Sequence, residues 1–163
     1  MKKKFKTILI CIIVLLFVSV CLPFLKGVYY YFYNSGEKDY YGENYNEILH
    51  IASLNDRYMS SKVLKQIDDA FSFIGTKDEA DEKFGVLGRY TVDSSRAVSE
   101  EHDLKFITAN LYDESGYIWV SYSQEIFDDN GNSVGGSWNV LSRMYLSRRG
   151  KDIWAVVNIW EHP

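Results

Sequence analysis

Three histidines, His50, His102 and His162, are the first residues of this sequence to consider for metal binding or acid–base chemistry. A helix that holds a metal ion carries two imidazoles three or four positions apart, and no two of these histidines are that close. The sequence therefore predicts no metal site and no cofactor. Residues 100–103, Glu-Glu-His-Asp, have the side chains of a general acid and base. Because this segment falls between predicted elements, we interpret it as a solvated loop.

Residues 128–132, with the sequence Asp-Asp-Asn-Gly-Asn, resemble the start of a calcium-binding loop. The EF-hand pattern needs glycine at its sixth position and a carboxylate at its twelfth, where this chain has Ser133 and Asn139. Residues 130–131, Asn-Gly, are instead typical of the two-residue turn of a β-hairpin. From residue 27 onward the sequence also lacks a glycine-rich phosphate loop, a serine-nucleophile motif and any cysteine. We therefore expect no catalytic residues and no enzymatic activity.

The predicted hairpin turns determine which strand residues share a face of the sheet. If residues 130–131 form one turn, Trp119 lies opposite Ser142 on the next strand. Residues 149–150, Arg-Gly, are expected to form the following turn. A bulge at Gly135–Gly136 would exchange some of these assignments, because one extra residue turns the side chains that follow to the other face.

In this register both faces of the sheet are apolar, one mostly aliphatic and the other aromatic with a single arginine. We assign the predicted helices to the aliphatic face, which leaves the aromatic face exposed as a surface for a protein partner. The predicted contact residues on it are Tyr122, Arg143, Tyr145, Trp154 and Trp160. The alternative is that these aromatic side chains form a second small core beneath residues 93–102.

The elements that must position these residues change from helical to strand periodicity along the chain. Apolar residues three or four positions apart in residues 46–74 predict an amphipathic helix, or two helices broken near Ser60 and Ser61. Thr76 and Glu79 predict a capping box for a short helix that ends at Gly85. The fold class is α+β, with amphipathic helices packed on an antiparallel meander. Segments rich in β-branched and aromatic residues predict its strands near residues 87–92, 104–112, 117–127, 137–148 and 153–161.

An apolar segment at residues 8–25 is interrupted only by Ser19 and Pro23. As a helix it is about 27 Å long, and extension to residues 5–28 lets it cross a bilayer core about 30 Å thick. We predict one transmembrane helix in the cell membrane. Four lysines precede it and Lys26 alone follows, so the N-terminus is expected in the cytoplasm. The alternative is a cleaved signal peptide, although the bulky residues that follow provide no small-residue cleavage site.

The chain is accordingly divided into three regions. Residues 1–28 hold the cytoplasmic lysines and the transmembrane anchor, residues 29–45 a tyrosine-rich juxtamembrane spacer, and residues 46–163 an extracytoplasmic domain. Of the 18 lysines and arginines five precede residue 27, so the rest of the chain carries 13 against 22 acidic residues, a net charge of −9. Such a charge excludes nucleic acid as a partner. The membrane, a second copy of this chain and an envelope protein are the partners that we expect.

Three segments carry a resemblance to a known family: residues 116–122, residues 136–139 (Gly-Ser-Trp-Asn) and the closing strand through Glu161-His-Pro. With helices that precede long strands, residues 45–163 resemble the NTF2-like superfamily, in particular its small membrane-anchored members in Firmicutes. The resemblance implies a cystatin-like cone, in which helices and a curved sheet enclose a cavity and the outer sheet face often forms dimers. Enzymes of the superfamily place Asp, His or Tyr pairs in that cavity, and the residues predicted to face inward include no such pair. We expect a non-enzymatic protein-binding domain at the cell envelope, with a small-molecule-binding or enzymatic domain as the alternative.

Overall fold

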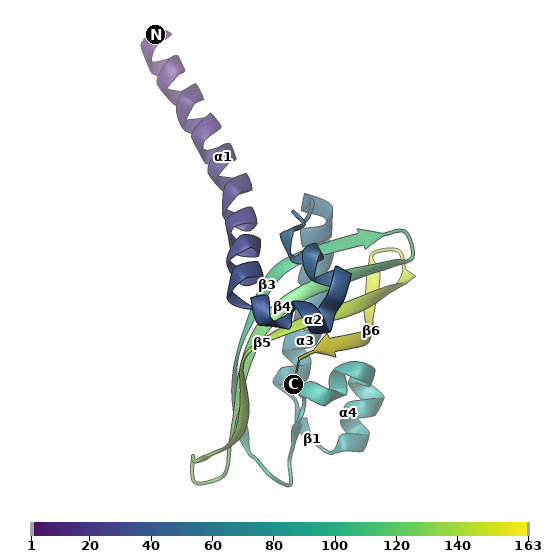
Figure 1. Ribbon diagram of the computed structural model, residues 1–163. Helices are drawn as coiled ribbons and strands as arrows, with labels where there is room; N and C mark the ends of the chain where they lie inside the picture. The colour runs from purple at the N-terminus through teal and green to yellow at the C-terminus, as the bar shows by residue number, and fades with distance from the viewer. Residues whose placement is uncertain (1, 163) are drawn as a thin grey trace.

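The first element, α1 (Lys2–Tyr33), is one continuous helix that extends from the apolar segment into the folded domain (Figure 1). The structure is a computed structural model that describes residues 2–162, except for the side chains of residues 2, 3 and 20. Within the described chain, Lys4–Tyr33 is the one helix that is long and apolar enough to cross a membrane. The predicted apolar helix is therefore confirmed, and it continues past residue 28 to Tyr33.

Three short helical segments occupy most of the region that was expected to be a spacer: η1 (Ser35–Glu37), α2 (Lys38–Tyr41) and η2 (Gly42–Leu49). Tyr41 and Tyr45 are each only 1% exposed, and both rings pack against Trp119 of the sheet. The Tyr41 hydroxyl donates a hydrogen bond to the carbonyl oxygen of Leu141 at 2.5 Å. Residues 29–45 are thus part of the folded domain and not a spacer, because two large aromatic rings are removed from water there.

The long helix α3 (Leu54–Phe71) begins at Ser53, which forms a capping box with Asp56. It runs without a break through Ser60, whose side chain is fully buried, so the alternative of two helices broken at this point is wrong. The first part of the predicted helix, before residue 50, is the separate segment η2. His50 follows it as an exposed residue outside any helix.

The predicted capping box of Thr76 and Glu79 is confirmed at the start of α4 (Lys77–Phe84). Gly85 ends this helix with a φ of 56°, a left-handed conformation that glycine adopts without strain. The strand predicted near residues 87–92 is instead the helical turn η3 (Gly85–Tyr90), followed by β2 (Val92–Asp93). β2 pairs in parallel with β1 (Ile74–Gly75).

The remaining strands form one antiparallel meander in the order β3-β4-β5-β6 (Figure 1). The bounds are β3 (Ser99–Tyr112), β4 (Ser115–Phe127), β5 (Ser133–Gly150) and β6 (Ile153–Glu161). Residues 100–103 therefore lie in a strand and not in a solvated loop. The loop at residues 128–132 joins β4 and β5 as predicted, with Gly131 at a φ of 77°.

The register of β4 with β5 agrees with the prediction only near this loop. Ile126 lies opposite Gly135, as predicted, but Phe127 lies opposite Ser133 and Gly131 N donates to the carbonyl oxygen of Asp128, so the predicted two-residue turn at residues 130–131 is wrong. Further along the strands, Trp119 lies opposite Arg143 and not Ser142. The shift occurs where Asn139 adopts a φ of 54°. A bulge therefore forms three residues beyond Gly136, and it reverses the faces of the residues that follow it.

The turn between β5 and β6 also differs from the prediction. Gly150 pairs with Ile153, so the turn consists of Lys151 and Asp152. Asp152 has a φ of 60°, which an aspartate in a tight turn tolerates. The prediction of a turn at residues 149–150 is therefore wrong.

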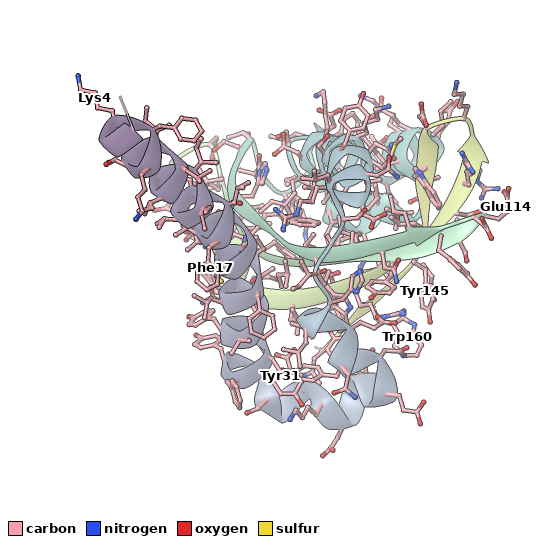
Figure 2. The ribbon with its side chains drawn as sticks, turned by 90° about the horizontal axis from the view of Figure 1, so that it is seen from above. Lys4, Phe17, Tyr31, Glu114, Tyr145 and Trp160 are labelled. Carbon is pink, nitrogen blue, oxygen red and sulfur yellow. The ribbon has the colours of Figure 1, made fainter. Side chains whose placement is uncertain are left out.

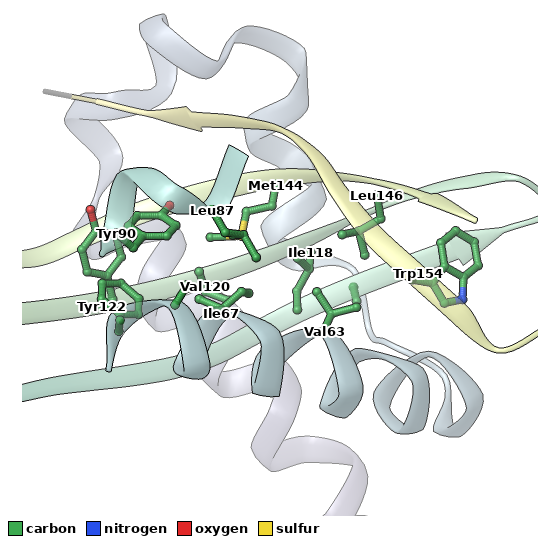
Figure 3. Close-up of a cluster of buried hydrophobic side chains, with 13 residues drawn as sticks. Val63, Ile67, Leu87, Tyr90, Ile118, Val120, Tyr122, Met144, Leu146 and Trp154 are labelled. Atoms are coloured by element: carbon green, nitrogen blue, oxygen red, sulfur yellow. The ribbon is translucent and has the colours of Figure 1, made fainter. Parts of the chain in front are cut away.

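Helices pack on both faces of the sheet. On the first face, α3 and η3 bury a cluster that includes Val63, Ile67, Ile118, Val120 and Met144 (Figure 3). On the second face, the end of α1 and η2 bury a smaller cluster around Trp119. The fold is thus an α+β domain in which a four-stranded antiparallel sheet lies between two helical layers.

Candidate functional site

The five predicted contact residues are divided between the two faces of the sheet. Tyr122 and Trp154 belong to the buried cluster beneath α3 (Figure 3). Arg143, Tyr145 and Trp160 lie on the second face, and Figure 2 shows Tyr145 and Trp160 on the same side of the sheet as Tyr31. The expected single exposed aromatic face is therefore wrong. The physical reason is two register shifts. The bulge at Asn139 moves Tyr122 away from the face of Arg143, and a shift between Tyr145 and Leu146, where Val157 is the extra residue of β6, moves Trp154, because a change of one residue in register moves side chains to the opposite face.

Arg143 is a structural residue that joins η2 to the sheet. It is only 3% exposed, and its Nε and Nη2 atoms donate to the two carboxylate oxygens of Glu47 at 2.7 and 2.9 Å. Trp119 Nε1 donates to the same carboxylate at 3.1 Å. The guanidinium also lies 4.0 Å from the ring centre of Tyr145. Burial lowers the pKa of Arg143, but the hydrogen bonds to Glu47 raise it by more. The pKa therefore lies above its usual value, and the group stays charged.

His102 is held on both sides by carboxylates, which sequence reasoning did not predict. Its Nε2 atom lies 2.9 Å from Asp68 Oδ1 of α3, and its Nδ1 atom lies 3.0 Å from Glu100 Oε2. The ring also stacks on Phe71. Burial lowers the pKa of His102, but the two hydrogen bonds raise it by more. The cluster connects β3 to α3, because Asp68 belongs to the helix and the other two residues to the strand.

A second polar cluster joins the C-terminal strand to η3. The Tyr90 hydroxyl donates to Glu161, which also pairs with Arg89 at 3.2 Å. Ser142 Oγ lies 3.3 Å from the same hydroxyl. Burial, and then the charge of Glu161, raise the pKa of Tyr90, so this hydroxyl stays protonated. It donates its one hydrogen to Glu161 and can accept a hydrogen bond from Ser142 Oγ. No spacing in the sequence identifies this cluster, since its members come from three separate elements.

The distal half of the second sheet face, beyond the cover provided by α1, α2 and η2, remains open. A depression of about 230 Å³ lies there, beside Trp138, whose side chain is 63% exposed. Glu101 of β3 and Glu125 of β4 also line it and lie directly opposite each other in the register. Like charges in this position repel each other. Among residues 2–162 neither carboxylate forms an ion pair within 4 Å.

We define the open sheet face as Glu101, Asp103, Ser123, Glu125 and Trp138, which β3, β4 and β5 contribute. Asp103 is bonded to Lys105, which leaves the face with a negative charge beside an exposed indole. Arginine and lysine are attracted by the face of a tryptophan ring as well as by carboxylates. The arrangement is therefore suited to a cationic group of a partner. The residues predicted from the sequence to form the exposed face did not include Trp138.

Comparison with known proteins identifies no relative: no family model matches the chain, and no curated protein or solved structure is significantly similar to it.

Proposed function

We propose that this protein is a single-pass membrane protein of the cell envelope, with an extracytoplasmic domain that binds a basic segment of a protein partner. The observation that carries the proposal is the open sheet face, an exposed tryptophan beside two carboxylates that have no cation of their own. Interface hot spots typically contain an aromatic side chain at the centre of a surface with a polar rim.

The membrane part of the proposal is supported by α1. Its apolar side chains between residues 5 and 18 are exposed, which suits a lipid environment and not water. The lysines at its start favour a cytoplasmic N-terminus, which supports an external position for the domain.

The junction between α1 and the domain has no linker. Gly27 is buried against the backbone of Ile48, and the Lys26 ammonium donates to the carbonyl oxygen of Phe106. Further along the helix, Tyr30 is buried in the cluster around Trp119. The domain is therefore held at a fixed orientation to α1, so the open sheet face would be presented at a constant angle to the membrane.

The order of helices followed by a meander supports a relationship to the NTF2-like superfamily as part of this proposal. Its members enclose a cavity between the helices and the sheet, and here Val63, Ile67 and Ile118 fill that space with apolar side chains. A filled interior favours a binding surface on the outside over an internal ligand or catalytic cavity.

Site-specific crosslinking in the native membrane tests this function. A photoreactive amino acid at position 138 should crosslink to one protein partner, whereas the same group at position 112 should not. Tyr112 is a matched control because its side chain is 71% exposed and lies outside the open sheet face. The double substitution E101Q/E125Q should abolish the crosslink, and so should high salt, because exposed charges are screened.

A crosslink from position 138 that survives E101Q/E125Q would contradict the electrostatic basis of the proposal. Equal crosslinking from positions 138 and 112 would show that the surface is not selective. If the only product were a dimer of this chain, the occupant would be a second copy and not a basic partner.

A further inference from the structure

A second cavity, of about 390 Å³, lies where α1 meets the domain. Leu22 and Pro23 of α1 line one side, and Leu64 of α3 and Phe106 of β3 line the other. The walls are predominantly apolar. Two cationic side chains, Lys26 and Arg57, complete the lining. We call this space the junction cavity.

The two cations of the junction cavity have hydrogen-bonding capacity to spare. Lys26 uses one donor on the carbonyl oxygen of Phe106, and Arg57 donates from Nε to the carbonyl oxygen of Ala52 at 3.2 Å. An ammonium group has three donors and a guanidinium five, so most of them remain for a ligand. In the described part of the chain neither residue forms an ion pair within 4 Å. Both are unpaired cations, although the chain that follows Lys26 has a net charge of −9.

The position along α1 determines which ligand can reach this cavity. Lys26 is the first charged residue after the apolar segment and therefore marks the level of the lipid headgroups. Leu22 lies four residues before it, about 6 Å deeper into the membrane. The junction cavity thus extends from the headgroup level into the acyl region, which lipids occupy.

The residues at the start of α3 also indicate that the junction cavity lies at the membrane surface. Arg57 belongs to this first part of α3, so the helix begins beside the membrane end of the junction. Leu54 there is 87% exposed, and Ile51 and Tyr58 are also exposed. Apolar and amphipathic side chains at this level are typical of a surface that rests on a membrane.

We propose that the junction cavity binds an anionic phospholipid of the outer leaflet. Its phosphate lies between Lys26 and Arg57, and an acyl chain lies along Leu22 and Pro23. Apolar walls continuous with the membrane helix match the chain, and the unpaired cations match the headgroup charge. This inference rests on the proposed placement of α1 in the membrane.

Native mass spectrometry of the full chain, released from detergent micelles doped with phosphatidylglycerol or phosphatidylcholine, tests the site. We expect phosphatidylglycerol to be retained in preference. A basic residue near an anionic surface contributes about a five-fold gain in binding, so K26Q/R57Q should weaken phosphatidylglycerol binding about 25-fold. The matched control is K62Q, which removes an exposed lysine of α3 that lies over the ring of Tyr58, outside the cavity. Circular dichroism establishes that each variant is folded.

The outcomes separate this site from the function on which it rests. Carbonate extraction of cell membranes reports on the anchor, since release of the protein would refute the membrane placement itself. If the protein stays in the membrane but retains both lipids equally, or K26Q/R57Q behaves like K62Q, the lipid site is refuted and the anchor is not. Displacement of the lipid by an equal concentration of glycerol phosphate would show that a free phosphate, and not a lipid, is the ligand.

Discussion

Replacement of Glu47 by glutamine should destabilise the protein more than replacement of its ion-pair partner Arg143 by methionine. The two residues share two hydrogen bonds, but they differ in burial: Arg143 is 3% exposed, whereas the side chain of Glu47 is 23% exposed. In E47Q a guanidinium that cannot lose its proton stays buried without a counter-charge. In R143M the remaining carboxylate is still reached by water and still accepts from Trp119 Nε1.

The expected magnitudes follow from this difference. Removal of one member of a buried ion pair costs about 3–5 kcal/mol when the other is left uncompensated. We expect about 3 kcal/mol for E47Q, because glutamine can still accept one hydrogen bond from Arg143. For R143M we expect about 1.5 kcal/mol, since Glu47 regains hydration and the main loss is the contact with the ring of Tyr145. The double variant should cost less than the sum of the two, because the isolated charge is gone.

Urea unfolding of the full chain in detergent micelles, followed by tryptophan fluorescence, measures these changes. All four tryptophans lie at residue 119 or beyond, so the signal reports on the domain and not on α1. With a slope of about 2 kcal/mol per molar urea, E47Q should lower the midpoint by about 1.5 M. E43Q, an exposed glutamate of the same segment, is the matched control and should have little effect. If R143M proved as destabilising as E47Q, the argument from unequal burial would be refuted.

Two further predictions concern the junction and the histidine. Gly27→Ala should destabilise the protein although alanine favours helix, because its Cβ would lie 2.6 Å from the carbonyl oxygen of Ile48. Gly36→Ala is the control and should not destabilise it, because the space around Gly36 is open. Melting temperatures of the two variants in micelles test this prediction. For His102, the folded-state pKa is raised, so its stabilising contribution is complete below the unfolded pKa of about 6.5 and is lost as the pH rises through the folded pKa. The stability difference between the wild type and H102Q, measured by urea unfolding, should therefore shrink from pH 6 towards pH 8.5, and a difference that grows with pH would contradict this assignment.

Local signals in the sequence determined most of the elements. The apolar run predicted α1, the spacing of Thr76 and Glu79 predicted a capping box, and alternating β-branched and aromatic residues predicted the four long strands. These features depend on residues within one or two turns of each other, so they are readable without knowledge of the fold. The hairpin loop at residues 128–132 belongs to this group as well, but the two-residue turn predicted within it does not.

The candidate site depended on the tertiary structure. The glycines at 135 and 136 indicated where a bulge could form, but not that it forms at Asn139, and that bulge places Tyr122 and Arg143 on opposite faces. Likewise Tyr41 and Tyr45 were predicted to lie in a juxtamembrane spacer, whereas the structure buries them against Trp119, more than seventy residues later in the chain. Side chains alternate with a period of two along a strand, so a single extra residue, selected by packing between distant segments, decides which side chains are buried and which form a surface.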